Sequence, residues 1–148
     1  MKKVVAYNEY WKCANADSDA DIIEEGDAIL FDDNTTELVP YGEQPKTQFS
    51  EMCNENEIKD FLKKYKKLCF VGDTVKIVKG RKMVGSTKVV AKTFTYMVNR
   101  STSVDYLVFT DNTRCLMDNC VNEYGNEIYE CLKTVDSYKF YHLGGRKY

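Results

Sequence analysis

The chain has 148 residues, with 21 Lys and Arg, 23 Asp and Glu, six Cys, one His and two Pro. This length is enough for one domain with a sizeable hydrophobic core. A hydrophobic fraction of 43% with 30% charged residues is the balance of a globular protein, so a disordered chain is excluded. No apolar run reaches the ~18 residues that a spanning helix needs, and the N-terminal run turns polar at Asn8. We therefore expect neither a membrane segment nor a signal peptide.

The net charge of −2 conceals a division of charge along the chain. Residues 13–58 carry thirteen acidic side chains and one basic one, a sum of −12. Residues 59–100 carry twelve basic and two acidic side chains, a sum of +10. Such asymmetry can mark an interaction surface, although the two blocks could also neutralise each other once folded.

The first third of the chain predicts short strands separated by polar segments. We expect strands at residues 3–7, 28–31 and 35–39, a loop at 13–21, and irregular structure at 41–53. The residues between the second and third strands, Asp32 to Asn34, tolerate a tight turn, so these strands predict a β-hairpin. Pro40 and Gly42 then end the pairing.

One amphipathic helix is predicted over residues 55–68. Asn54 is a good N-cap and Glu57 stands three positions later, as in a capping box. The apolar residues at helical spacing are Ile58, Phe61, Leu62, Tyr65, Leu68 and Cys69. The opposite face carries Lys63, Lys64, Lys66 and Lys67, which we interpret as solvated and suited to the C-terminal end of the helix dipole.

After Phe70 the apolar period changes to two. Strands are expected at residues 71–78, 89–98, 104–110, 114–117 and 120–121, with turns at 111–112 and 118–119. Five short strands with tight polar turns indicate a small antiparallel barrel. The chain beyond Asn126 shows both helical spacing, at residues 128–135, and strand-like character, at residues 138–141.

Residues 71–122 resemble the KOW-type, SH3-like barrel found in small phage proteins. The resemblance rests on Val71-Gly72-Asp73 with alternating Val and Ile, the basic loop at residues 79–85, and the paired Val89-Val90. Lys88 stands where many members of that family have glycine. Together with the predicted hairpin and helix, this resemblance leads us to expect an α+β chain, mostly antiparallel β, with an SH3-like barrel preceded by a β-hairpin and one amphipathic helix. We expect an acidic N-terminal part at residues 1–68, a barrel at 69–123 and a C-terminal extension at 124–148.

The residues that could carry catalysis or bind metal do not form a known pattern. The six Cys include no Cys-x2-Cys pair, and the single His142 lies near Gly144-Gly145, so structural zinc is not expected. Asp17, Asp19 and Asp21 begin like an EF-hand loop, but Ile22 and Ala28 stand where Gly and Glu are required. There is no phosphate-binding glycine loop, because Gly80 and Gly85 precede Ser86-Thr87 rather than Lys-Ser. We therefore expect no cofactor, no metal and no enzymatic activity.

Two opposite binding surfaces remain. The acidic one comprises Asp17, Asp19, Asp21, Glu24, Glu25, Asp27, Asp32 and Asp33, and could imitate nucleic acid toward a basic groove, unless it is only a solvated acidic segment. The basic and aromatic one comprises Lys76, Lys79, Arg81, Lys82, Lys88, Lys92, Phe94, Tyr96 and Arg100. Cations of this kind hold phosphates and rings stack on bases, although Phe94 could instead fill the barrel and the cations line solvated strands.

The expected function is that of a non-catalytic binding protein. The barrel resemblance and the Lys-, Asn- and Tyr-rich composition suggest a phage origin, so the partner would be a host protein or nucleoprotein complex, modulated or inhibited in the host cytoplasm as an anti-defence protein. A KOW-like nucleic-acid-binding module and a virion structural component are the alternatives.

Overall fold

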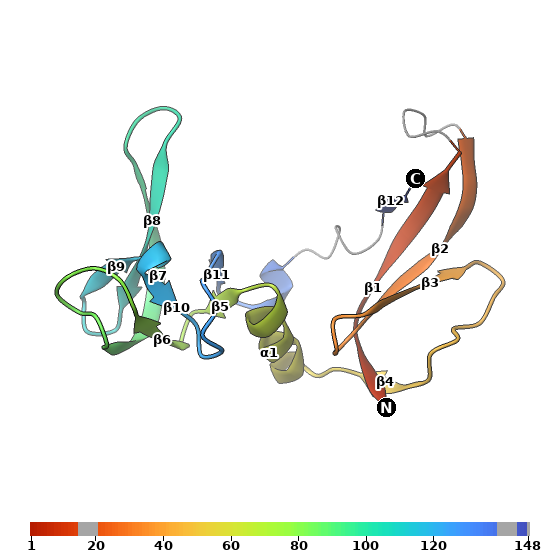
Figure 1. Ribbon diagram of the computed structural model, residues 1–148, viewed down its shortest axis with the longest axis horizontal. Helices are drawn as coiled ribbons and strands as arrows, with labels where there is room; N and C mark the ends of the chain where they lie inside the picture. Colours follow the sequence, from red (N-terminus) through yellow and green to blue (C-terminus); the bar gives the residue numbers. More distant parts are fainter. Residues whose placement is uncertain (15–20, 139–144, 148) are drawn as a thin grey trace. The chain divides into compact units, whose positions relative to one another are not determined.

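The computed structural model describes residues 1–14, 21–138 and 145–147. The chain forms two compact units: unit 1 contains Met1–Ile58 and Tyr138–Tyr148, and unit 2 contains Lys59–Ser137. These units divide the chain within its helix, whereas the sequence places boundaries after residues 68 and 123. Strands make up 49% of the chain, and the described residues include one α-helix, which confirms an α+β, mostly antiparallel chain (Figure 1).

Unit 1 is built on one five-stranded sheet. Its strands are β1 (Lys2–Cys13), β2 (Ile22–Phe31), β3 (Thr36–Pro40), β4 (Phe49–Met52) and β12 (Gly145–Lys147). The order is β12-β1-β2-β3, with β4 also beside β1; β2 is antiparallel to both β1 and β3, whereas β4 and β12 run parallel to β1. The predicted β2–β3 hairpin is confirmed, with Asn34 in its turn at a φ of 67°.

Three expectations for unit 1 differ from the structure, the first being the start of the second strand, because β2 begins at Ile22 rather than at residue 28. β1 continues to Cys13 because β2 pairs with it along most of its length, so the polar residues beyond Tyr7 are still in the sheet. The segment expected to be irregular contains β4, an edge strand in which Ser50, Glu51 and Met52 are exposed. An exposed edge strand lacks the alternation of apolar and polar residues by which strands are found in a sequence.

One core cluster of unit 1 lies between β1, β2, β3 and β4. Val4, Ile29, Phe31 and Val39 are buried there, and Phe49 of β4 packs against them. The Phe31 and Phe49 ring centroids are 5.9 Å apart. This packing fixes the register of β1, β2 and β3, because a one-residue slip would turn these side chains to the other face.

The helix α1 (Glu55–Tyr65) begins as the sequence predicts. The Asn54 side chain accepts a hydrogen bond from the Glu57 backbone N–H at 2.9 Å, and the Glu57 carboxylate accepts one from the Asn54 N–H at 3.1 Å. This is the predicted capping box. The helix ends at Tyr65, before the expected residue 68, because Lys67 adopts a φ of 60° and reverses the chain direction.

The lysine-rich face of α1 is not uniformly solvated. Lys63 is buried, and its ammonium contacts the carboxylates of Asp60, Asp73 and Glu123. The interpretation of this residue as solvated is therefore wrong. Asp60 is three residues earlier in the same helix, but Asp73 and Glu123 lie outside it, so helical spacing could not indicate them.

Unit 2 contains a five-stranded antiparallel sheet and a two-stranded parallel one. The elements are β5 (Leu68–Phe70), β6 (Thr74–Ile77), β7 (Thr87–Met97), β8 (Ser103–Phe109), β9 (Arg114–Leu116), η2 (Met117–Asn119), β10 (Cys120–Val121), β11 (Glu130–Leu132) and η3 (Val135–Ser137). The larger sheet has the order β10-β6-β7-β8-β9, and β5 pairs with β11 in parallel. The strand expected at 71–78 is the shorter β6, because Gly72, with a φ of 96°, lies in a turn before it, and Leu68, the expected end of the helix, belongs to β5.

The larger sheet of unit 2 covers a core of alternating apolar residues. The buried members are Cys69, Val75, Ile77, Val90, Leu107, Phe109, Met117, Cys120 and Ile128. The expected strands of this region are present, and the expected turn at 118–119 is the 3-10 helix η2. Among the described residues, β9 and β10 end the sheet without pairing to each other, so no closed barrel is found.

Candidate interaction surfaces

The predicted acidic residues do not form one surface. Asp17 and Asp19 lie outside the described residues, whereas Asp21, Glu24, Glu25, Asp27, Asp32 and Asp33 lie along β2 or beside its ends. Asp32 and Asp33 are in the β2–β3 turn, at the opposite end of β2 from Asp21 and Glu24. The acidic set is therefore divided between the two ends of one strand.

Some of these carboxylates have partners within unit 1. Glu24 accepts a hydrogen bond from the buried Tyr10 hydroxyl at 2.8 Å and lies 3.3 Å from the Lys12 ammonium. These contacts lower the pKa of Glu24, and burial with the Glu24 hydrogen bond raises the pKa of Tyr10 to about 12. A hydrogen bond from the Thr35 hydroxyl and the nearby Lys2 ammonium lower the pKa of Asp33 to about 2. Such carboxylates are less available to a partner.

Three carboxylates without a cation partner gather with aromatic rings on one face of the sheet. Glu9 and Asp27 are direct partners in the β1–β2 register, and Trp11 and Glu25 are the next pair on the same face. Tyr7 precedes Glu9 on this face, and Tyr41 extends the β3 side, where its N–H donates to the Glu25 carbonyl at 3.0 Å. We call this set the acidic-aromatic face: Tyr7, Glu9, Trp11, Glu25, Asp27 and Tyr41.

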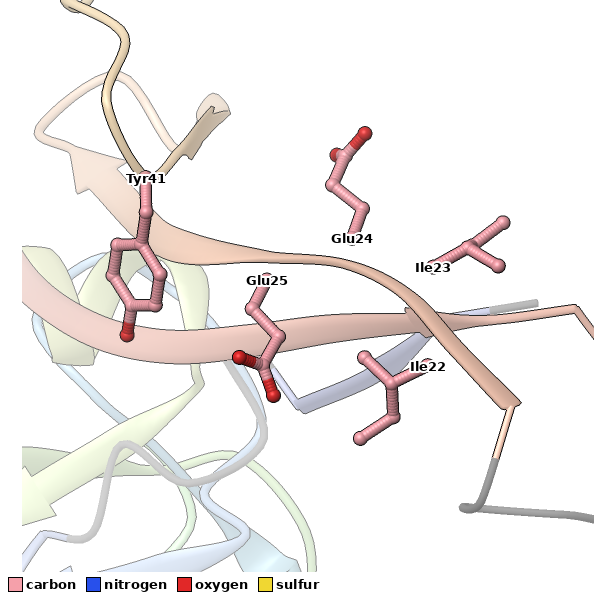
Figure 2. A pocket seen from close by; sticks show the side chains of 5 residues that line it. All are labelled: Ile22, Ile23, Glu24, Glu25 and Tyr41. Carbon is pink, nitrogen blue, oxygen red and sulfur yellow. The ribbon is translucent and has the colours of Figure 1, made fainter.

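The acidic-aromatic face is open to solvent and hollowed beside Tyr41. Tyr7 is 49% exposed and Tyr41 58% exposed. A shallow hollow of about 420 Å³ is lined by Ile22, Ile23, Glu24, Glu25 and Tyr41. Figure 2 shows the Glu25 carboxylate and the Tyr41 ring on the same side of β2, with Glu24 on the other side. Partial burial and the charges of Glu9, Asp27 and Glu25 raise the pKa of Tyr41.

Four residues of this face were missed by sequence reasoning. Glu9 stands in the short basic N-terminal segment, and Tyr7, Trp11 and Tyr41 carry no charge. Their only signal is the alternation of Tyr7, Glu9 and Trp11 along one strand. The β1–β2 register was needed to place Glu9 opposite Asp27.

The predicted basic and aromatic residues divide into three groups. Lys79, Arg81 and Lys82 lie in the exposed loop between β6 and β7. Lys76 and Lys88 point to opposite faces of the β6–β7 pair, and the Lys88 ammonium is paired with Asp111. Lys92, Phe94, Tyr96 and Arg100 lie on the distal part of the β7–β8 hairpin. One continuous surface over all nine residues is therefore not formed.

The distal hairpin carries the most exposed apolar surface of unit 2. We call residues 92–108 the arm; Figure 1 shows its tip projecting beyond the other strands of that unit. Lys92, Phe94 and Tyr96 share one face with their partners Val108, Tyr106 and Val104, and Arg114 of β9 lies beside Val108. We call these seven residues the arm face. Tyr106 and Arg114 were missed because they lie outside the basic strand-loop-strand segment.

The cysteines are free thiols and belong mostly to the cores. Cys13, Cys53, Cys69 and Cys120 are buried, and the other two are half-buried. The described residues contain no group of three side chains that could hold a metal ion, and His142 lies outside them. Within the described ranges, no helix is both long enough and apolar enough to cross a membrane. Comparisons of the chain with protein-family models, curated proteins and solved structures give no match.

Proposed function

We propose that this chain is a non-catalytic binding protein, encoded by a phage, that modulates or inhibits a host protein or nucleoprotein complex. Its contact is the acidic-aromatic face, and the partner surface is cationic, as in the nucleic-acid groove of a nuclease or polymerase. The carrying observation is the direct pairing of Glu9 with Asp27, beside the exposed rings of Tyr7 and Tyr41.

The like-charged pair has a physical cost that a solvated acidic segment would not carry. Carboxylates directly opposite on one face of a sheet repel each other and destabilise the pair. Among the described residues, no Lys or Arg lies within ion-pair distance of Glu9, Glu25 or Asp27. A cationic partner would remove the repulsion and gain two or three charge-assisted hydrogen bonds.

The rings on the same face favour a protein partner that presents Arg or Lys. Tyr and Trp rings attract a cation through their faces, and carboxylates bind the guanidinium of Arg in a bidentate manner. A nucleic acid would be repelled, because unit 1 carries fourteen acidic and seven basic side chains, a net charge of −7. The same field would accelerate association with a cationic groove.

The SH3-like barrel and the phage origin belong to the same proposal. In support of the barrel, the sheet of unit 2 has the order β10-β6-β7-β8-β9, and the three-residue helix η2 connects its two outer strands. The phage origin is supported by the resemblance of residues 71–122 to small phage proteins with this barrel.

The test is a pull-down from host lysate with the tagged full chain, before and after nuclease treatment. We expect a basic nucleic-acid-binding protein that survives nuclease, is competed by DNA, and is lost with the triple variant Glu9→Gln, Glu25→Gln, Asp27→Asn. The matched control removes three exposed carboxylates from unit 2 by Glu127→Gln, Glu130→Gln and Asp136→Asn. Equal retention of the partner by both variants would refute the proposed face.

A further inference from the structure

The arm face is a second surface, independent of the proposed function. Phe94 is 44% exposed and Tyr96 is 53% exposed, although both belong to a regular strand pair. Met97 and Val98 at the end of β7 are also exposed. Exposed aromatic residues gathered on one projecting element are typical of a binding surface rather than of a packed sheet.

Two rings of the arm face contact each other, and one of them also contacts a cation. The Phe94 and Tyr106 ring centroids are 6.2 Å apart, with an angle of 45° between the ring planes. The Arg114 guanidinium lies 5.4 Å from the Tyr106 centroid. Phe94 and Tyr96 are two residues apart on one strand, roughly 6.6 Å along it, so each keeps a ring face free for a ligand.

The other face of the arm has no aromatic residue, although the buried Leu107 and the exposed Met97 lie there, so the aromatic character is one-sided. Thr93, Thr95 and Asp105 lie on that face, and the Thr95 hydroxyl donates to the Asp105 carboxylate at 2.7 Å. Asp105 is the one acidic residue of the arm, and this hydrogen bond holds its carboxylate on the face away from the rings. The arm face itself carries Lys92 and Arg114 and has no acidic residue.

The cations of the arm face, and Arg100 in the turn at its tip, are available to a ligand. Among the described residues, Lys92, Arg100 and Arg114 have no carboxylate within ion-pair distance, whereas Lys88 at the base of the hairpin is paired with Asp111. Unit 2 carries fourteen basic and nine acidic side chains, a net charge of +5. The ligand that fits is therefore anionic and presents flat apolar groups.

We propose that the arm face binds single-stranded nucleic acid. Unpaired bases would stack on Phe94, Tyr96 and Tyr106, and backbone phosphates would contact Lys92 and Arg114. In a duplex the bases are already stacked on each other, so duplex DNA would offer the arm face only its phosphates.

A hollow beside the arm face offers the strand a continuation. It measures about 260 Å³, and Val104, Leu116 and Tyr129 contribute to its lining. A neighbouring hollow of about 330 Å³ shares Tyr129 and reaches Lys79. Asp105 and Asp118 line the first hollow, and Asp118 and Glu127 line the second, so the path there favours bases and sugars over phosphates.

The test measures binding of a fluorescein-labelled oligo(dT) strand of about 12 nucleotides to the full chain by fluorescence anisotropy. Replacement of Phe94 and Tyr96 by Thr keeps residues that suit strands and removes both rings. We expect about tenfold weaker binding for each ring removed, since stacking on one ring contributes roughly that factor. The matched control replaces the exposed rings of unit 1, by Tyr7→Thr and Tyr41→Thr, and should bind the strand as the wild type does.

Salt dependence and a duplex of equal length complete the test. If Lys92 and Arg114 each neutralise one phosphate, affinity should fall about sevenfold between 50 and 200 mM salt. The duplex should bind at least tenfold more weakly than the single strand. The proposal would be overturned if the arm variant bound the single strand as tightly as the wild type does, or if the wild type bound the duplex as tightly as the single strand. It would also be overturned if the arm variant kept its affinity for the strand and lost only a nuclease-resistant protein in the pull-down. Thermal unfolding of the variants checks that the fold is retained. Because the two surfaces are independent, loss of the host partner in the Glu9, Glu25 and Asp27 variant alone would leave the strand-binding result unaffected.

Discussion

Single residues in this protein owe their roles to partners that are distant in the sequence. Lys63 is the best example, because its ammonium is buried among carboxylates from α1, from the segment after β5 and from the segment after β10. Burial lowers its pKa, but the hydrogen bond with Glu123 and the charges of Asp73 and Asp60 outweigh burial, and the net pKa is raised. The ammonium thus stays charged and holds three segments of unit 2 together.

Replacement of Lys63 by Met should destabilise unit 2, because three carboxylates would lose their shared cation. Removing one partner of a buried ion pair costs 3–5 kcal/mol, but the Asp60 and Glu123 side chains are 58% and 53% exposed, so solvent screens part of the loss. We expect a decrease of about 1–3 kcal/mol in the free energy of unfolding, measured with urea. The matched control Lys64→Met, on the exposed side of the same helix, should change it by less than about 0.5 kcal/mol. Equal effects of the two variants would contradict the assigned role.

Tyr10 predicts a loss of stability at alkaline pH. Its pKa is raised from the ordinary value near 10 to about 12, because the hydroxyl is buried and donates to Glu24. Between these two pH values the unfolded chain releases the proton while the folded chain retains it, so stability falls as the pH rises through this window.

The variant Tyr10→Phe isolates this effect. At pH 7 it should be less stable than the wild type by about 0.5–1.5 kcal/mol, since the hydrogen bond to Glu24 is lost. The difference in stability between the two proteins should shrink progressively above pH 10, because only the wild type has the Tyr10 phenol and loses stability as this group titrates. Tyr7→Phe, on the exposed part of the same strand, should show no such convergence. A constant difference between pH 7 and pH 11.5 would show that Tyr10 titrates normally.

At the scale of elements, the sequence predicts best where the structure depends on neighbours in the chain. The capping box of Asn54 and Glu57 and the β2–β3 hairpin are confirmed, because both arise from interactions within a few residues. The strands of unit 2 follow the alternation of Val75, Ile77 and Val90 toward one core. Hydrogen bonds between near neighbours and a single buried face both produce a residue pattern from which the element can be predicted.

The missed elements depend on non-local pairing. β5 pairs in parallel with β11, which lies some sixty residues later, and Cys69 and Cys131 are direct partners there. β4 joins the sheet through β1 at the edge, with mostly exposed side chains. The candidate surfaces could not be predicted for the same reason, because they depend on the register between strands. The register places Glu9 opposite Asp27, and it brings Tyr106 and Arg114 together on the arm face.

For the whole molecule, the division of charge in the sequence becomes a division between units. Unit 1 has a net charge of −7 and unit 2 a net charge of +5, so the linear blocks persist as two folded parts. Much of the charge is nevertheless used internally, as for Lys63, Lys88 and Asp33. The charges available to partners include the unpaired carboxylates of the acidic-aromatic face on unit 1 and the unpaired cations of the arm, and these two sets differ in sign.

If the acidic-aromatic face is kept for a partner, its charges should oppose stability in the free protein. The variant Glu9→Gln removes the repulsion with Asp27, so we expect the free energy of unfolding to rise by about 0.2–1 kcal/mol at low salt. The gain should disappear near 1 M salt, where the screening length falls to about 3 Å. Glu127→Gln, an exposed carboxylate of unit 2, is the control and should not stabilise the chain. The same Glu9 variant should bind the cationic partner more weakly, so stability and binding would change in opposite directions. A variant that loses stability at low salt would mean that Glu9 is held by a favourable contact, and the repulsion would then no longer support a binding role for this face.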